Sequence, residues 1–134
     1  MATMTNQSKT SLAKCKWCDK EFKSDRTLAA HMCVKKRRWG DKDMTHIRLA
    51  HRVFQMFYDM NTASSKPKSM EDFIRSTYYE GFTKFGRSCL VNEYLKPESF
   101  AEWLIKNGKK LADWSKDSTY DTFLLEYVRK EPGM

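Results

Sequence analysis

Two cysteines and one histidine near the N-terminus have the spacing of metal ligands. Cys15 and Cys18 form a C-x2-C pair, and His31 follows thirteen residues after Cys18. Two thiolates on one tight turn face a common point, and an imidazole from a following helix can approach the same point. A unit this short buries too little apolar surface to fold alone, so we expect it to fold around a metal ion, Zn²⁺.

The residues between these ligands include two apolar positions at regular spacing. The stretch CKWCDKEFKSDRTLAAH reads C-x2-C-x3-F-x5-L-x2-H, with Phe22 and Leu28 as the apolar pair. This pattern resembles the two-cysteine two-histidine zinc-finger family, and the resemblance implies a ββα unit whose helix begins near Asp25. The alternative, a hairpin with incidental free cysteines, is disfavoured because five spaced positions match together.

The fourth ligand departs from the family pattern. A His or Cys is expected three to five residues after His31, but the run Lys35-Lys36-Arg37 stands there. We predict Cys33 as the fourth ligand. It can reach the site only if the helix unwinds after His31, because residues two apart on a helix point to different sides. His46 and His51, in the following helical segment, are the alternatives.

The net charge of +8 is unevenly distributed. Residues 1–40 hold ten Lys/Arg against three Asp/Glu, whereas residues 41–134 hold fifteen against fourteen. Such an excess of positive charge favours binding to a polyanion, most often nucleic acid, although an acidic protein surface would also be a suitable partner. The predicted nucleic-acid contacts are Lys23, Arg26, Lys35, Lys36, Arg37, Arg38 and Trp39. The alternative for the basic run is a solvated linker.

The finger itself has little capacity to read a base sequence. The helix positions that contact bases in the family fall on Ser24, Thr27 and Ala30. None is an Arg, Asn or Gln, the residues that read bases with paired hydrogen bonds. One finger also covers only about three base pairs. We therefore expect binding with little sequence specificity.

After the basic run, apolar residues recur at three- and four-residue steps, which predicts helices. Four segments are expected to begin at Thr45, Ser69, Pro97 and about Thr119. Gly86 is predicted to end the second helix, and Gly81 to mark a close packing contact within it. Cys89 is predicted to be an ordinary buried cysteine.

The predicted fold class is therefore mainly α, a small N-terminal ββα zinc finger followed by a bundle of about four helices. The expected boundaries are a disordered tail over residues 1–13, the finger with its basic extension over 14–39, and a helical domain over 44–131. No apolar run approaches the roughly 20 residues that span a bilayer, and no signal peptide is evident. We expect a soluble cytoplasmic protein with reduced thiols.

Three longer runs carry a second resemblance. TLAAHMCVKKRRW, FIRSTYYEGFTKFGR and FAEWLIKNGKKLADW look similar to segments of small zinc-finger proteins of large tailed bacteriophages. The resemblance implies a phage protein acting in the infected bacterial cytoplasm, on DNA or on host or viral machinery for transcription and replication. It implies no established activity.

Three functions compete on these grounds. The first is a nucleic-acid-binding accessory protein, with DNA favoured over RNA. The second is an adaptor whose basic surface meets an acidic face of a polymerase or replication protein. The third is a small nuclease using His46 and His51, with Asp41 and Asp43 nearby. We expect no enzyme, because three histidines and scattered carboxylates leave little for general acid-base catalysis.

Overall fold

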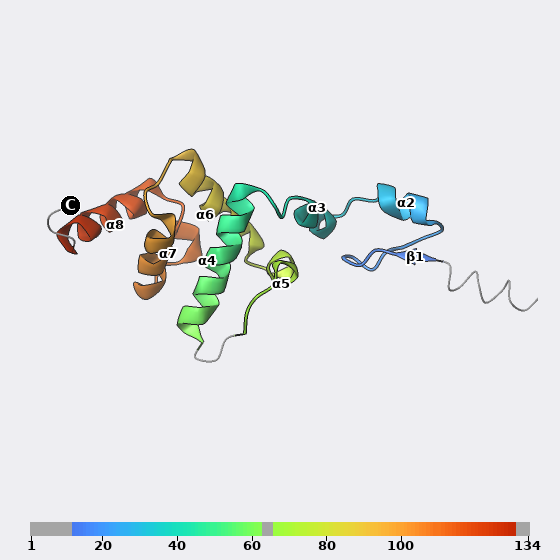
Figure 1. The fold of residues 1–134 in the computed structure, drawn as a ribbon, viewed down its shortest axis with the longest axis horizontal. Coiled ribbons are helices and arrows are strands. Elements are labelled where there is room, and N and C mark those ends of the chain that lie inside the picture. The colour runs from blue at the N-terminus through green and yellow to red at the C-terminus, as the bar shows by residue number, and fades with distance from the viewer. Residues whose placement is uncertain (1–11, 63–65, 131–134) are drawn as a thin grey trace, which may run out of the picture. The chain divides into compact units, whose positions relative to one another are not determined.

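The computed structural model describes residues 12–62 and 66–130. The chain divides into two compact units, Met1–Asp41 and Lys42–Met134, and each is described by itself. The fold is mainly helical, with a small two-stranded antiparallel sheet at the N-terminal end followed by helices (Figure 1). The predicted fold class is thus confirmed.

The first unit, which we call the finger unit, contains two short strands and two short helices. In chain order these are β1 (Ala13–Lys14), β2 (Glu21–Phe22), α2 (Asp25–Ala30) and α3 (Val34–Gly40). We expected the tail to extend to residue 13, but Ala13 is buried and pairs with Phe22, so it is the first residue of β1. Leu12 is exposed and belongs to no strand or helix, and residues 1–11 lie outside the described residues.

The basic run, which we expected as an extension or linker, forms helix α3. Lys and Arg have high intrinsic helix propensity. Arg37 and Arg38 lie in the last turn, where cations interact favourably with the carbonyl end of a helix. The N–H of Asp41 closes the helix on the carbonyl of Arg37 at 3.1 Å. The charges of this run therefore have fixed helical positions.

The second unit, which we call the helical unit, contains five α-helices and one 3₁₀ turn among its described residues. These are α4 (Thr45–Asn61), α5 (Met70–Arg75), α6 (Tyr79–Val91), α7 (Pro97–Lys106), η1 (Leu111–Asp113) and α8 (Asp117–Lys130). Its core is aromatic, and Phe73, Phe82, Phe85, Phe100 and Trp114 are its largest fully buried side chains. No described helix has both the length and the apolar composition needed to cross a bilayer. Residue 131, the predicted end of this domain, lies outside the described residues.

The predicted second helix is in fact two helices, α5 and α6. Ser76 ends α5 in an extended conformation, and its Oγ accepts the N–H of Tyr78 at 3.0 Å. Serine side chains often form such local hydrogen bonds, which compete with the backbone hydrogen bonds that would continue the helix. The prediction that Gly86 ends the helix is wrong, because α6 continues to Val91.

Two other sequence predictions for this unit are confirmed. A Cβ added to Gly81 would lie 2.5 Å from Cδ2 of Leu111, so Gly81 does mark a close packing contact. Cys89 is 2% exposed, and burial raises the pKa of its thiol to about 12. A thiol with that pKa is almost entirely protonated at neutral pH, so it is an inert core side chain.

Candidate metal centre

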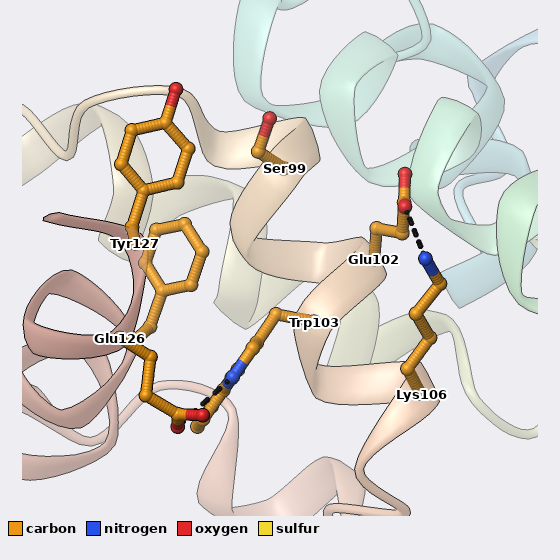
Figure 2. A pocket seen from close by; sticks show the side chains of 7 residues that line it. Ser99, Glu102, Trp103, Lys106, Glu126 and Tyr127 are labelled. Carbon is orange, nitrogen blue, oxygen red and sulfur yellow. Dashed lines mark hydrogen bonds and ion pairs between the residues drawn. The ribbon is translucent and has the colours of Figure 1, made fainter. Parts of the chain in front are cut away.

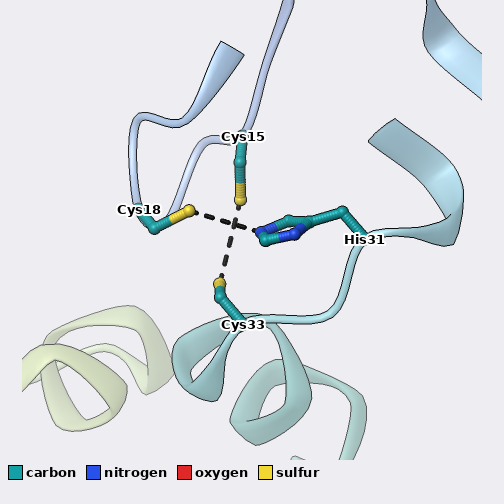
Figure 3. Close-up of side chains that lie close together, drawn as sticks. All are labelled: Cys15, Cys18, His31 and Cys33. Carbon is teal, nitrogen blue, oxygen red and sulfur yellow. Dashed lines mark hydrogen bonds between the residues drawn. The ribbon is translucent and has the colours of Figure 1, made fainter. Parts of the chain in front are cut away.

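Backbone hydrogen bonds close the turn that carries the first two cysteines. The N–H of Cys15 donates to the carbonyl of Lys20 at 2.9 Å, and the N–H of Asp19 donates to the carbonyl of Cys15 at 2.9 Å. Asp19 has a φ of 66°, a left-handed conformation that Asp tolerates better than most residues. The turn brings the thiols of Cys15 and Cys18 toward one centre (Figure 3).

Apolar packing in the finger unit depends on a residue outside the predicted apolar pair. Trp17, between the two cysteines, is 7% exposed, and its ring centroid lies 5.6 Å from that of Trp39. Phe22 and Leu28, the predicted pair, are only half-buried. Phe22 packs on the ring of His31, with centroids 4.7 Å apart. Trp17 thus contributes more to this small core than either predicted residue.

Helix α2 ends early enough for Cys33 to reach the other ligands. Ser24 caps its start, because the Ser24 Oγ accepts the N–H of Thr27 at 3.2 Å. The helix ends at Ala30, and His31 is already extended, with φ −70° and ψ 138°. The chain therefore leaves the helical path between His31 and Cys33. This is the condition under which H-x-C ligation becomes possible.

Four side chains converge on one point, Cys15, Cys18, His31 and Cys33 (Figure 3). Their ligand atoms all lie within 4.8 Å of one another. Cys15 Sγ is 3.9 Å from Cys33 Sγ, and Cys18 Sγ is 3.3 Å from His31 Nε2. Zinc bond lengths of about 2.3 Å to sulfur and about 2.0 Å to nitrogen give tetrahedral edges of about 3.8 Å and about 3.5 Å. The cluster can therefore hold a metal ion with four protein ligands.

The thiols of this cluster influence one another's ionisation. Burial raises the pKa of Cys15, but hydrogen bonds with the backbone of Cys18 and Trp17 and with the thiols of Cys18 and Cys33 together outweigh it, so the pKa is lowered overall. The backbone of Lys20 lowers the pKa of Cys18, but burial and the neighbouring thiols of Cys15 and Cys33 raise it overall. The negative charge of one thiolate thus makes the neighbouring thiol harder to deprotonate. A bound cation removes this conflict, because it stabilises all the thiolates together.

Lys36 has a role inside the finger unit. Its ammonium donates to the carbonyls of Leu28 at 2.9 Å and His31 at 2.8 Å, with a longer contact of 3.4 Å to Ala29. These carbonyls lie at the end of α2, where a cation is favoured by the helix dipole. We predicted Lys36 as a nucleic-acid contact. In the structure its charge lies on the helix end beside a metal ligand, and its contact with nucleic acid stays a prediction.

The other predicted nucleic-acid residues lie on α2, its approach and α3. Lys23, Arg26 and Arg37 are exposed, whereas Lys35 and Arg38 are half-buried. Trp39 is 37% exposed and packs on Trp17, so it is a partly accessible ring held within the finger unit. Two of the three side chains expected to face bases already make hydrogen bonds within the finger unit. Ser24 and Thr27 bond to each other's backbone N–H groups and so cap the start of α2.

The alternative histidine ligands are absent from the metal-ligand group. Among residues 12–62 and 66–130, that group contains neither His46 nor His51. The Nε2 atom of His51 lies 2.6 Å from the carbonyl oxygen of Lys68, and its ring stacks on Phe73 with centroids 5.8 Å apart. His51 therefore has hydrogen-bonding and stacking partners within the helical unit.

No family model, curated protein or solved structure gives a significant match to this chain. Its function is accordingly inferred from the residues and their geometry.

Two functional roles had only weak sequence signals. Lys36 stands five residues after His31, and a cation at that distance past a short helix can fold back on its last carbonyls. Trp17 stands between the cysteines of the C-x2-C pair, where a large apolar ring is unusual on an exposed turn. Both signals are weaker than the regular spacing of the zinc-finger pattern. That pattern identifies Phe22 and Leu28, and not Trp17, as the apolar pair.

The identity of the fourth ligand can be tested with Co²⁺ as a spectroscopic probe. We expect Cys33→Ala to reduce the sulfur-to-metal charge-transfer band from the intensity of three thiolates to that of two, because each thiolate adds its own transition. His51→Ala should leave the band and the Co²⁺ affinity unchanged. A full-strength band in Cys33→Ala, with reduced affinity in His51→Ala or His46→Ala, would exclude Cys33 as the ligand.

Proposed function

We propose that this chain is a zinc-binding, nucleic-acid-binding accessory protein with little intrinsic sequence specificity. Three sulfurs and one imidazole form a soft donor set that suits zinc better than magnesium or calcium. All four positions are filled by protein side chains, as in structural zinc sites, whereas catalytic zinc keeps one position open. The zinc would therefore have a structural role, in which it holds the finger unit folded so that the surface of this unit can contact a partner.

The observation that carries the nucleic-acid proposal is that α3 begins directly after the last ligand of the cluster. Cys33 is the N-cap of α3, and Lys35, Arg37 and Arg38 follow on this helix. Residues 12–41 hold nine Lys/Arg against four Asp/Glu. A metal-anchored helix with fixed cations suits the phosphate backbone, whose neutralisation supplies most sequence-independent affinity.

Low sequence specificity follows from the same surface. Ser24 and Thr27 use their side-chain oxygens to cap α2, so the base-facing positions offer few groups for readout. Phosphate contacts position a protein without carrying sequence information. We propose that partner proteins or a second contact select the site of action, in transcription or replication within a reducing cytoplasm. The resemblance to bacteriophage proteins is compatible with the cytoplasm of an infected host.

Salt dependence provides the test. Replacing Lys35, Arg37 and Arg38 together by Ala should weaken binding to all duplex DNA sequences alike. The slope of log affinity against log salt should fall by up to about 2.7, at roughly 0.9 for each phosphate that the variant no longer neutralises. Lys36→Ala is a separate case, because its charge lies on the end of α2, and it should lower the stability of the finger unit.

A matched control separates local contacts from net charge. Replacing Lys84, Arg87 and Lys110 by Ala removes three exposed cations from the helical unit and changes net charge equally. This control should leave the slope nearly unchanged. An equal slope in the wild-type protein and the α3 variant would argue against phosphate binding by α3.

One observation favours the adaptor as a second candidate. Met32 and Val34 flank Cys33 and are 61% and 53% exposed. Exposed apolar side chains beside a basic helix also suit a protein partner with an acidic rim and an apolar centre. Met32→Ser with Val34→Ser would weaken capture of such a partner but leave the salt-dependent DNA affinity intact.

A further inference from the structure

A small aromatic groove lies between α7 and α8 of the helical unit (Figure 2). Its volume is about 230 Å³. The lining includes the rings of Trp103, Phe123 and Tyr127, with centroids 5.8 Å apart for the first pair and 5.5 Å apart for the second. This volume is below the range of about 300 to 1,000 Å³ of sites for drug-sized ligands, so the groove fits one flat ring system.

Polar groups lie at both ends of the aromatic wall. The hydroxyls of Ser99 and Tyr127 lie near one end, and the carboxylate of Glu126 lies near the other (Figure 2). The indole N–H of Trp103 donates to Oε2 of Glu126 at 3.1 Å. This bond orients both the ring and the carboxylate. A carboxylate has several acceptor sites, so Glu126 can accept a further hydrogen bond from a ligand.

Aromatic rings and carboxylates together can also bind an organic cation, but two lysines over the rings disfavour that ligand. The ammonium of Lys96 lies 5.8 Å from the ring centroid of Tyr127, and that of Lys109 lies 5.6 Å from the ring of Trp103. Lys106 pairs with Glu102 at 2.8 Å. That pair leaves Lys96 and Lys109, and an incoming cation would meet these two ammonium groups already lying over the rings. A ligand with a flat ring and a phosphate would instead find both stacking surfaces and counter-charges.

We propose that the α7–α8 groove binds one nucleobase of a single-stranded nucleic acid, with preference for bases that carry an exocyclic amine. The base would stack on Trp103 and Tyr127, its amine would donate to Glu126, and Lys96 and Lys109 would face the flanking phosphates. Carboxylates accept from the amine of cytosine, whereas thymine and uracil have no such donor. The inference rests on the proposed function and adds to it a second contact and a base preference.

The test follows the indole N–H signal of Trp103 by NMR in the metal-loaded full chain, assigned with Trp103→Phe. The probes are oligo(dC) and oligo(dT) of about ten nucleotides, within the range that single-strand sites cover. We expect oligo(dC) to shift this signal at a concentration about tenfold lower than oligo(dT) does. Tyr127→Ala should weaken both by about tenfold, because it removes a stacking surface. Glu126→Leu should abolish the preference for oligo(dC), because it leaves no acceptor for the amine.

Leu125→Ala is the matched control, because Leu125 is 63% exposed on α8 and does not line the groove. It should bind both probes like the wild-type chain. If the Trp103 signal stays fixed while the Trp39 signal moves, the groove is not a base site, although the finger still binds nucleic acid. If no indole signal responds to either probe, the groove is not a base site, and the salt dependence of duplex DNA binding decides the proposed function separately. A response to tetramethylammonium alone would identify a cation site and overturn the proposal.

Discussion

Removal of the metal by a chelator is expected to unfold the finger unit and leave the helical unit folded. Among residues 12–41, only Ala13, Cys15 and Trp17 are buried apolar side chains, too few to offset the conformational entropy of ordering the segment. A structural zinc supplies about 10 to 16 kcal/mol to a folded finger peptide. The helical unit has its own aromatic core, so its stability should not depend on the metal.

Thiol counting measures this outcome, because the chain has four cysteines in two different environments. After chelation at pH 8, three thiols should react quickly with a disulfide reagent. Cys89 should remain unreactive, because its buried thiol has a pKa of about 12, and it should react only after urea is added. Cys15→Ser and Cys18→Ser should abolish metal binding while retaining most of the helical circular dichroism. Rapid reaction of all four thiols upon chelation would instead show that the two units fold together.

The finger could be predicted because its determinants are close in sequence. The ligands span residues 15–33, and each turn or helix end that brings them together depends on residues nearby in the sequence. The Ser24 cap, the end of α2 before His31 and the return of the chain at Cys33 depend on residues only a few positions apart. Local spacing was therefore sufficient to predict the strands, α2 and three of the ligands, and it favoured Cys33 over His46 and His51 as the fourth.

The helical unit was harder to predict because apolar periodicity registers neither local side-chain hydrogen bonds nor distant contacts. Apolar periodicity located the helices but joined α5 to α6, since it cannot register the hydrogen bond between Ser76 and Tyr78. The helix-stop signal at Gly86 failed for a different reason. The glycine is needed for the close approach of another helix, which only the tertiary structure reveals.

The role of Lys36 shows a related limit. A run of four cations gives each residue the same sequence-level interpretation, although they have different environments once α3 forms. Only the return of α3 toward the end of α2 distinguishes Lys36, whose ammonium has three carbonyls within 3.4 Å. A charge pattern therefore cannot distinguish the separate environments of the residues within it.

Gly86→Ala is expected to cost the helical unit about 3 kcal/mol or more of its free energy of unfolding. Gly86 is buried in α6, and an added Cβ would overlap the backbone carbonyl oxygen of His46 in α4 and meet Cβ of Ala50 at 3.5 Å. A backbone carbonyl within a packed helix cannot move aside without shifting the helix. The intrinsic helix preference of Ala over Gly, about 1 kcal/mol at most, offsets only part of this cost.

Gly81→Ala is the matched control, because it introduces the same methyl group into the same helix. There the added Cβ would lie 2.5 Å from Cδ2 of Leu111, the end of a half-buried side chain that can rotate away. Its net cost should therefore stay near or below about 1 kcal/mol. Urea denaturation followed by circular dichroism, with metal present throughout, measures both variants. Equal destabilisation at the two positions would mean that α4 and α6 adjust freely, and that the close approach of Gly86 to the His46 carbonyl does not fix their packing.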